Sequence, residues 1–206
     1  MRQVTLEELG QVAANSREEL WAAAHSAGLK NPLVILHWTA GHYGQFFEDD
    51  YHVQIDEGGE IYLSTPNLAE VLAHTWHLNR GTVGISLCCA CFATTEDLGD
   101  EPPTEAQIEA MAQVIAVLCA NLWLTCNDRE IVMTHGEAGD NSDLYDDCDL
   151  YGPQSDALER WDLEYLGTPE SPEYNPWATD GTRGGDVLRR KAAEYQRKCN
   201  AEGRAL

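Results

Sequence analysis

The sequence contains no long uninterrupted apolar run. A membrane-spanning helix needs roughly 18 to 20 such residues in succession, and no stretch of this 206-residue chain approaches that length. The N-terminus, MRQVTLEELGQ, also lacks the apolar core of a secretory signal peptide. We therefore expect neither a transmembrane segment nor export by the general secretory pathway.

Basic side chains are scarce. Lys and Arg number 13 against 35 Asp and Glu, which gives a net charge of −22. Residues 183–206 hold seven of the basic residues and three of the acidic ones, a charge of +4, so the rest of the chain carries −26. Such an acidic body repels phosphate, which argues against a nucleic-acid partner. The basic tail either draws the protein to anionic envelope polymers or lipids, or it docks on the protein's own acidic surface, and we favour docking.

The seven cysteines do not fall into paired metal-binding spacings. Cys88, Cys89 and Cys91 crowd one apolar run, and Cys119 and Cys126 flank the end of an expected helix. A metal or redox cluster is one interpretation of the first three. We prefer buried free thiols, which are common in proteins made in a reducing cytosol.

Strand-like and helix-like segments alternate along the chain, which predicts an α/β fold with a central mixed sheet flanked by helices. Apolar runs and a glycine-turn hairpin predict strands at 33–36, 51–56, 60–63, 82–88 and 130–133. Capping residues predict two short helices opened by Thr5 and Ser16, a long helix over 104–124 that begins with a capping box, and a basic helix over 185–199. We divide the chain into N-terminal helices (1–29), a main domain (30–166) and a Pro/Gly linker with the basic helix (167–206).

Two histidines directly follow expected strands: His37 after Leu33–Leu36, and His135 after Ile131–Thr134. Side chains at strand ends project into the crevice where α/β sheets commonly place ligands. Two neutral imidazoles and a carboxylate make the three-ligand zinc site that leaves a fourth position for water. A histidine beside a strand is also commonly a hydrogen-bonded structural residue, so the surrounding motifs have to decide.

Six blocks of sequence, in order over residues 33–163, resemble the zinc-dependent N-acetylmuramoyl-L-alanine amidase family, which includes phage lysozyme-type amidases and peptidoglycan recognition proteins. The blocks are Leu36–Gly41, Tyr51–Gly59, His74–Ile85, Pro103–Gln107, Thr134–Ala138 and Arg160–Asp162. The resemblance implies a single catalytic domain of that family's fold. It also implies hydrolysis of the amide bond between N-acetylmuramic acid and L-alanine in bacterial peptidoglycan.

Position by position, the resemblance implies His37, His135 and Asp162 as the ligands of Zn²⁺. The acidic stretch 140–149 intervenes before Asp162, where other members have a short loop, and this leaves the third ligand open. The alternatives are Asp146, Asp147, Cys148 and Asp149. We favour Asp162 because Arg160-Trp161-Asp162 reproduces the family's spacing between a basic residue and the ligand. The acidic stretch is a calcium site, a specificity element or a solvated loop, and we expect the loop.

The resemblance assigns catalytic positions to Tyr51, Arg160 and Glu137. Tyr51 would orient the water or donate to the developing oxyanion, and Arg160, where the family usually has a lysine, would stabilise that charge. Glu137 would orient His135 or move a proton, since buried carboxylates can reach near-neutral pKa values. Packing for Tyr51 and a surface ion pair for Arg160 are the structural alternatives. Some bacterial members carry a catalytic glutamate where this chain has Ser86, so that route is closed here.

Three further residues are expected at the substrate groove: His74, Trp38 and Asn79. The first lies in the block that resembles the family's cleft segment, and a tryptophan can stack against a sugar or peptide. A core position is the alternative for both His74 and Trp38. We expect His52 and His77 to be structural.

These residues support three functional hypotheses. The first is a zinc hydrolase of phage or prophage type, an endolysin or lytic effector. The second is a non-catalytic module that binds muropeptides, and the third is a metal-free cytosolic protein. Because all three expected zinc ligands are present, we favour the enzyme, and we expect a monomer. It would be made in the bacterial cytoplasm and reach the cell wall by a route other than the general secretory pathway.

Overall fold

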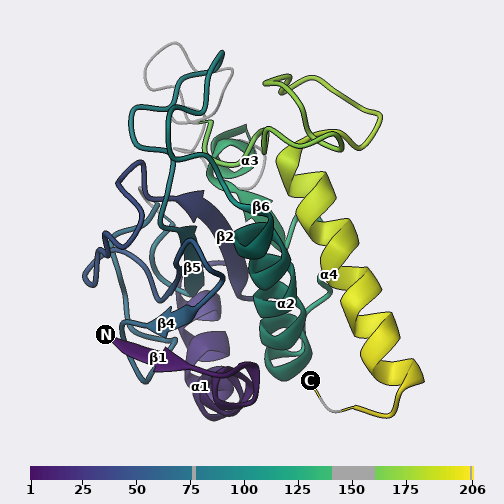
Figure 1. Cartoon of the computed structure of the whole chain (residues 1–206). Coiled ribbons are helices and arrows are strands. Elements are labelled where there is room, and N and C mark those ends of the chain that lie inside the picture. The colour runs from purple at the N-terminus through teal and green to yellow at the C-terminus, as the bar shows by residue number, and fades with distance from the viewer. Residues whose placement is uncertain (76–77, 141–160, 205) are drawn as a thin grey trace.

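The computed structural model describes residues 1–75, 78–140, 161–204 and 206, and it is built around a six-stranded mixed sheet (Figure 1). The strands are β1 (Arg2–Val4), β2 (Leu33–Trp38), β3 (Val53–Ile55), β4 (Ile61–Leu63), β5 (Thr82–Leu87) and β6 (Val132–Thr134). Their order is β1-β4-β3-β5-β2-β6. β2 runs parallel to β5 and β6, and β3 runs parallel to β5. β4 is antiparallel to β1 and β3, so the predicted mixed sheet is confirmed.

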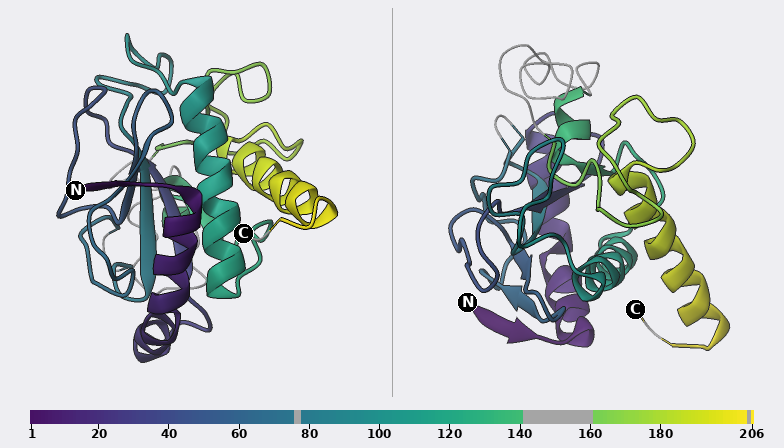
Figure 2. Two further views of the ribbon diagram at one scale, coloured as in Figure 1. Left: turned by 60° about the horizontal axis from the view of Figure 1, so that its bottom comes forward. Right: turned by 45° about the horizontal axis from the view of Figure 1, so that its top comes forward.

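The described helices are α1 (Leu6–Ser26), α2 (Glu105–Leu122), α3 (His135–Asp140) and α4 (Gly184–Ala201). α2 lies between α1 and α4 and contacts both (Figure 2). None of these helices combines the length and the apolar character that a membrane crossing requires. The arrangement leaves α2 as the central helix of the layer that packs on the sheet.

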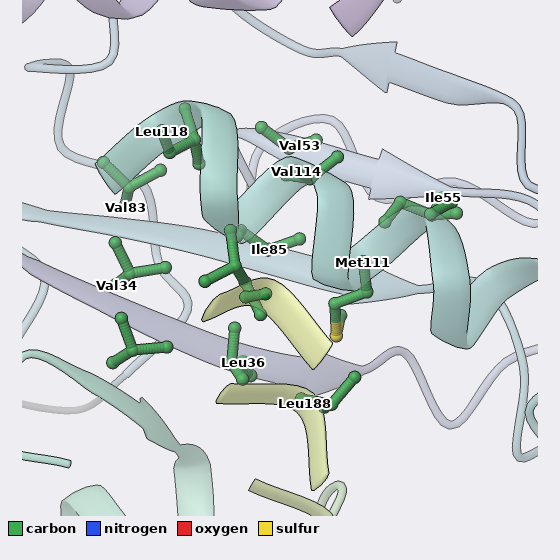
Figure 3. Close-up of a cluster of buried hydrophobic side chains, with 14 of the residues drawn as sticks. Val34, Leu36, Val53, Ile55, Val83, Ile85, Met111, Val114, Leu118 and Leu188 are labelled. Carbon is green, nitrogen blue, oxygen red and sulfur yellow. The ribbon is translucent and has the colours of Figure 1, made fainter. Parts of the chain in front are cut away.

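Alternation along β2 sends its side chains to two different faces of the sheet. Val34 and Leu36 lie in the main core, beneath α2. Figure 3 shows this contact with the neighbouring apolar side chains Val53, Ile55, Val83, Ile85, Met111, Val114, Leu118 and Leu188. Leu33 and Ile35 belong instead to a second cluster on the opposite face, with Met133. His37 follows the same alternation, so it points to the face away from α2.

The predicted capping box at the start of α2 is confirmed. The hydroxyl of Thr104 accepts a hydrogen bond from the backbone N–H of Gln107 at 3.0 Å, and the side-chain oxygen of Gln107 accepts one from the N–H of Thr104 at 3.0 Å. The buried amide of Gln107 also donates to the carbonyls of Ile55 and Cys88, both at 3.1 Å. One glutamine therefore caps the helix and fixes it to the ends of β3 and β5.

The prediction of two short N-terminal helices is wrong, because α1 is one continuous helix of 21 residues. Thr5 caps it as expected, but Ser16 lies in its middle and is buried. The Ser16 hydroxyl donates to the carbonyl of Val12 at 2.9 Å and accepts from the N–H of Leu68 at 3.0 Å. Serine is typical of helix starts, but this one forms a hydrogen bond to a loop distant in the sequence. Only the tertiary structure creates that contact.

Candidate active site and metal centre

His37, His135 and Asp162 come together at one edge of the sheet. His37 is the fifth residue of β2, and His135 follows β6 as the first residue of α3. Because β2 and β6 are parallel neighbours, their carboxyl ends meet, and the two imidazole centroids lie 4.7 Å apart. β6 is the last strand in the sheet order, so His135 follows an outer strand and His37 lies on the strand next to it. Asp162 reaches the pair from the chain segment between α3 and α4.

A single carboxylate oxygen links the two histidines. Oδ2 of Asp162 lies 3.3 Å from Nδ1 of His37 and 3.3 Å from Nδ1 of His135. Burial raises the pKa of Asp162, but the two imidazoles outweigh it and hold that pKa well below its usual range. The group is therefore a carboxylate at neutral pH. His37 is fully buried, whereas 17% of the Asp162 side chain is exposed, so the cluster opens to solvent on the Asp162 side.

His74 stands behind His37 and is also buried, with 5% of its surface exposed. Its Nδ1 lies 3.3 Å from Nε2 of His37 and 3.0 Å from the Thr75 hydroxyl. Its Nε2 lies 3.0 Å from the hydroxyl of Thr82, which itself donates to the carbonyl of Leu78 at 2.5 Å. Both nitrogens of His74 thus face protein groups, which favours the core alternative, and a contact with substrate stays a prediction.

Glycine at position 84 makes room for the His74 ring. A Cβ atom on Gly84 would come within 2.6 Å of Cγ of His74. The backbone N–H of Gly84 donates to Nδ1 of His52 at 3.0 Å, so the proton of that neutral ring sits on Nε2 and is donated to the carbonyl of Glu70 at 2.9 Å. Burial lowers the pKa of His52 to about 4, in keeping with its expected structural role.

Tyr51 is the expected catalytic residue that the structure places beside the cluster. Its ring centroid lies 5.1 Å from that of His37, with the planes tilted by 52°. Arg160 lies outside the described residues. So do the alternative third ligands Asp146, Asp147, Cys148 and Asp149, and His77.

Glu137 lies in a network of buried hydrogen bonds and ion pairs beside His135. Its carboxylate accepts hydrogen bonds from Arg189 at 2.6 and 2.9 Å and from the backbone N–H of Thr134 at 2.9 Å, and it also pairs with Arg129. Burial raises the pKa of Glu137, but the hydrogen bonds and positive charge of Arg189 have the larger effect. The pKa of Glu137 therefore lies below its ordinary value. Of the two expected roles, this environment favours orientation of His135 over proton transfer. Glu137 is a fixed anion that secures the turn carrying His135.

A second buried ion pair supports the same turn. Glu164 accepts from the hydroxyl of Thr134 at 2.6 Å and from two nitrogens of Arg183 at 2.9 and 2.6 Å. Sequence reasoning missed both Arg183 and Arg189. The available signal was the position of Arg189 next to Val187 and Leu188, on the apolar side of an otherwise polar helix.

Two expected substrate contacts remain. Trp38 is 4% exposed and packs edge-on against Tyr165, with centroids 6.1 Å apart. This favours the core alternative for Trp38, because alternation along β2 puts it on the face opposite His37. Asn79 is half-buried, and its side-chain oxygen accepts from the backbone N–H of Thr75 at 2.7 Å. Asn79 is thus tied to the residue that follows His74, and a contact with substrate stays a prediction.

Comparison with known proteins identifies the family of the chain. The sequence profile of the N-acetylmuramoyl-L-alanine amidase family matches residues 28–148, more than half of the chain. The match includes His37, Tyr51 and His135 and ends before Asp162. A search of curated proteins gives no match. On the profile match, the chain belongs to the N-acetylmuramoyl-L-alanine amidase family.

Proposed function

We propose that this protein is a zinc-dependent hydrolase that cleaves the amide bond between N-acetylmuramic acid and L-alanine in peptidoglycan. Membership of the family supports amidase activity on peptidoglycan in general. The observation that carries the zinc proposal is the position of one Asp162 oxygen, 3.3 Å from an imidazole nitrogen of each of His37 and His135.

These distances fit the donor spacing of a zinc site. Nitrogen and oxygen ligands bind Zn²⁺ at about 2.0–2.1 Å, so two of them at a tetrahedral angle are about 3.3–3.4 Å apart. The donor atoms of His37, His135 and Asp162 all lie within 4.8 Å of one another. Three protein ligands leave the open position that distinguishes catalytic zinc sites from structural ones. The residues present therefore fit the metal that the family implies.

The surroundings of His37 support its role as a ligand. The Thr82 hydroxyl gives its proton to a carbonyl, so it accepts from Nε2–H of His74. Nδ1 of His74 then carries a lone pair and accepts from Nε2–H of His37. In the metal-bound protein this order of donors would let Nδ1 of His37 give up its proton and bind the ion while Nε2 keeps its own, the state that metal binding requires. We assign His74 as a positioning residue that sets the tautomer of His37.

The chemistry divides between the metal and the chain. Bound zinc would lower the pKa of a water molecule, which then serves as a nucleophile near neutral pH, and it would also polarise the amide carbonyl. The hydroxyl of Tyr51, beside His37, would donate to the oxygen of the amide carbonyl as charge develops there. Arg160 would add a fixed positive charge to the same oxyanion, and since arginine keeps its proton, it would stabilise rather than protonate. Glu137 would hold the His135 turn in place.

The experiment pairs metal analysis of the purified protein with mass spectrometry of digested peptidoglycan. We expect one catalytic zinc and the release of intact stem peptides with a free L-alanine amine. His37→Ala and Asp162→Ala should each lose this zinc and the activity, whereas His25→Ala, on the exposed end of α1, should keep both. Cleavage between sugars or within the peptide would refute the proposed bond. Zinc and muropeptide binding without cleavage would instead indicate a binding module.

The third ligand needs its own test, because the acidic stretch holds competing donors. Full zinc content and activity in Asp162→Ala would assign the ligand to that stretch. Substitution of Cys148 by serine and of Asp146, Asp147 and Asp149 by asparagine would then identify it. We expect these four variants to bind zinc as the unaltered protein does.

The proposal extends to a biological setting: a monomeric phage or prophage endolysin, or a lytic effector, that acts on the cell wall. The peptidoglycan substrate of the family supports it, because bacterial peptidoglycan lies outside the cytoplasmic membrane. Production in a bacterial host should lyse cells only when the protein is directed to the wall, and His37→Ala should abolish lysis. Sedimentation should report a single chain.

A further inference from the structure

His42, Cys91 and Glu101, which we term the rim cluster, form a second group of metal-ligating side chains. One donor atom from each lies within 4.8 Å of the others. Nε2 of His42 lies 3.5 Å from Sγ of Cys91, and Nδ1 of His42 lies 2.7 Å from Oε2 of Glu101. None of the three belongs to the proposed catalytic site, and neither the resemblance nor the family match assigns them a role.

Backbone contacts hold the three loops of the rim cluster in register. Gly41 and Ala90 form a parallel bridge that continues the pairing of β2 with β5 beyond the strands. The N–H of Ala90 donates to the carbonyl of Glu101 at 2.7 Å. The hydroxyl of Tyr43 donates to the carbonyl of Pro102 at 2.5 Å. His42 and Cys91 therefore each directly follow a residue of the bridge, and Glu101 itself accepts a hydrogen bond from Ala90.

The hydrogen-bonding order suits a ligand histidine. The Glu101 carboxylate accepts, so the imidazole proton of His42 is on Nδ1 and is donated to Oε2. Nε2 then presents its lone pair toward the sulfur of Cys91. A carboxylate that holds the remote N–H of a metal-bound histidine is the usual arrangement around protein zinc.

The distance between nitrogen and sulfur fits the same metal. Zinc binds thiolate at about 2.3 Å and imidazole at about 2.0–2.1 Å, which puts the two donors about 3.5 Å apart at a tetrahedral angle. We propose that Cys91 and His42 bind a zinc-like divalent ion, with Glu101 orienting the imidazole. The Cys91 thiol releases its proton to solvent as the metal–sulfur bond forms. With 62% of the His42 side chain exposed, water can take the remaining positions.

The neighbouring thiols are unsuited to this role. Cys88 and Cys89 are fully buried, and burial raises the pKa of Cys88 to about 12 and that of Cys89 well above its ordinary value. Cys91 is partly exposed and is the thiol of this run that faces an imidazole. The run thus divides into two buried thiols, the interpretation that we preferred from the sequence, and one partly exposed thiol, Cys91, which is the proposed ligand.

Cobalt(II) distinguishes the two metal sites by spectroscopy, because a thiolate ligand gives an intense near-ultraviolet charge-transfer band that histidine and carboxylate ligands do not. The full chain and His135→Ala are titrated with cobalt(II), since the latter disables the proposed catalytic site. We expect the band in both proteins. We expect it to disappear in Cys91→Ser and to require about 10–100-fold more metal in Glu101→Gln, the usual loss when an orienting partner is removed.

Cys148→Ser is the matched control, because Cys148 is a competing donor elsewhere in the chain. It should keep the band, and circular dichroism without metal should show Cys91→Ser folded. No band in the full chain at saturating cobalt would overturn the proposal. A band that persists in Cys91→Ser would also overturn it, by assigning the sulfur ligand elsewhere. Zinc at His37 is tested separately by the zinc content and activity of His37→Ala, so this proposal fails independently of the catalytic one.

Discussion

Arg189 donates to both carboxylate oxygens of Glu137, Nη1 to Oε2 at 2.6 Å and Nη2 to Oε1 at 2.9 Å, although 52 residues separate them in the chain. The pair is buried on both sides. Through this pair, α4 contacts α3, which directly follows β6. His135 is the first residue of α3. The basic helix near the C-terminus is thereby fastened to the proposed metal centre.

Arg189→Met should therefore destabilise the protein strongly. Removing one partner of a buried ion pair leaves an uncompensated charge and typically costs about 3–5 kcal/mol. We expect that loss in denaturant unfolding. Arg190→Met is the control, because Arg190 pairs with Glu170 at the surface and should contribute less than about 1 kcal/mol. Equal effects of the two substitutions would show that the buried pair does not stabilise the fold.

Tyr51→Phe should slow the reaction and leave the metal in place. The hydroxyl is proposed to act on the substrate carbonyl, and loss of one such donor typically lowers kcat about 10²–10³-fold. Zinc content should not change, since Tyr51 is not a proposed ligand. Tyr62→Phe, a half-buried tyrosine on β4, should retain normal kcat. Loss of zinc in Tyr51→Phe would instead assign the residue to the support of the site.

His74→Phe should weaken zinc binding without removing a ligand. Phenylalanine cannot accept a hydrogen bond from Nε2–H of His37, so the tautomer of His37 is no longer fixed. Loss of such an orienting partner typically lowers metal affinity about 10–100-fold. Chelator competition measures this. His74→Gln keeps an acceptor and a donor and should recover most of the affinity. Wild-type affinity in the phenylalanine variant would rule out a positioning role.

His52 should make stability fall in mild acid. Its folded pKa of about 4 lies below the unfolded value of 6.5, so the unfolded chain binds more protons between these values. The stabilisation is complete above pH 6.5 and is lost as the pH falls toward 4, since protonation of Nδ1 breaks its bond from Gly84. Between about pH 7.5 and about pH 5 the loss from this one group is roughly 2 kcal/mol.

Urea unfolding of the zinc-free protein at the two pH values tests this, with His52→Gln for comparison. The glutamine variant will be less stable at both, so the relevant quantity is the difference between them. We expect that difference to shrink by roughly 2 kcal/mol. An unchanged difference would mean that His52 does not carry the acid sensitivity.

Much of the fold follows from local patterns. The apolar run at 33–36, the glycine-turn hairpin and the capping box at Thr104 each specify an element through contacts within a few residues, and the structure contains all three. The predicted helix start at Ser16 was wrong for the opposite reason. Its hydroxyl accepts a hydrogen bond from the backbone N–H of Leu68, which lies 52 residues away and belongs to no local pattern.

The sequence by itself determined the α/β fold and the family, because periodicity, caps and motif order are properties of short segments. It also singled out His37, His135 and Asp162. Tertiary structure alone decided which neighbours serve that site: strand alternation sent Trp38 into the core, and Arg189 turned Glu137 into a fixed anion. It also brought His42 to Cys91, 49 residues further along the chain. Side-chain roles of this kind depend on charges and donors that meet only after the chain has folded.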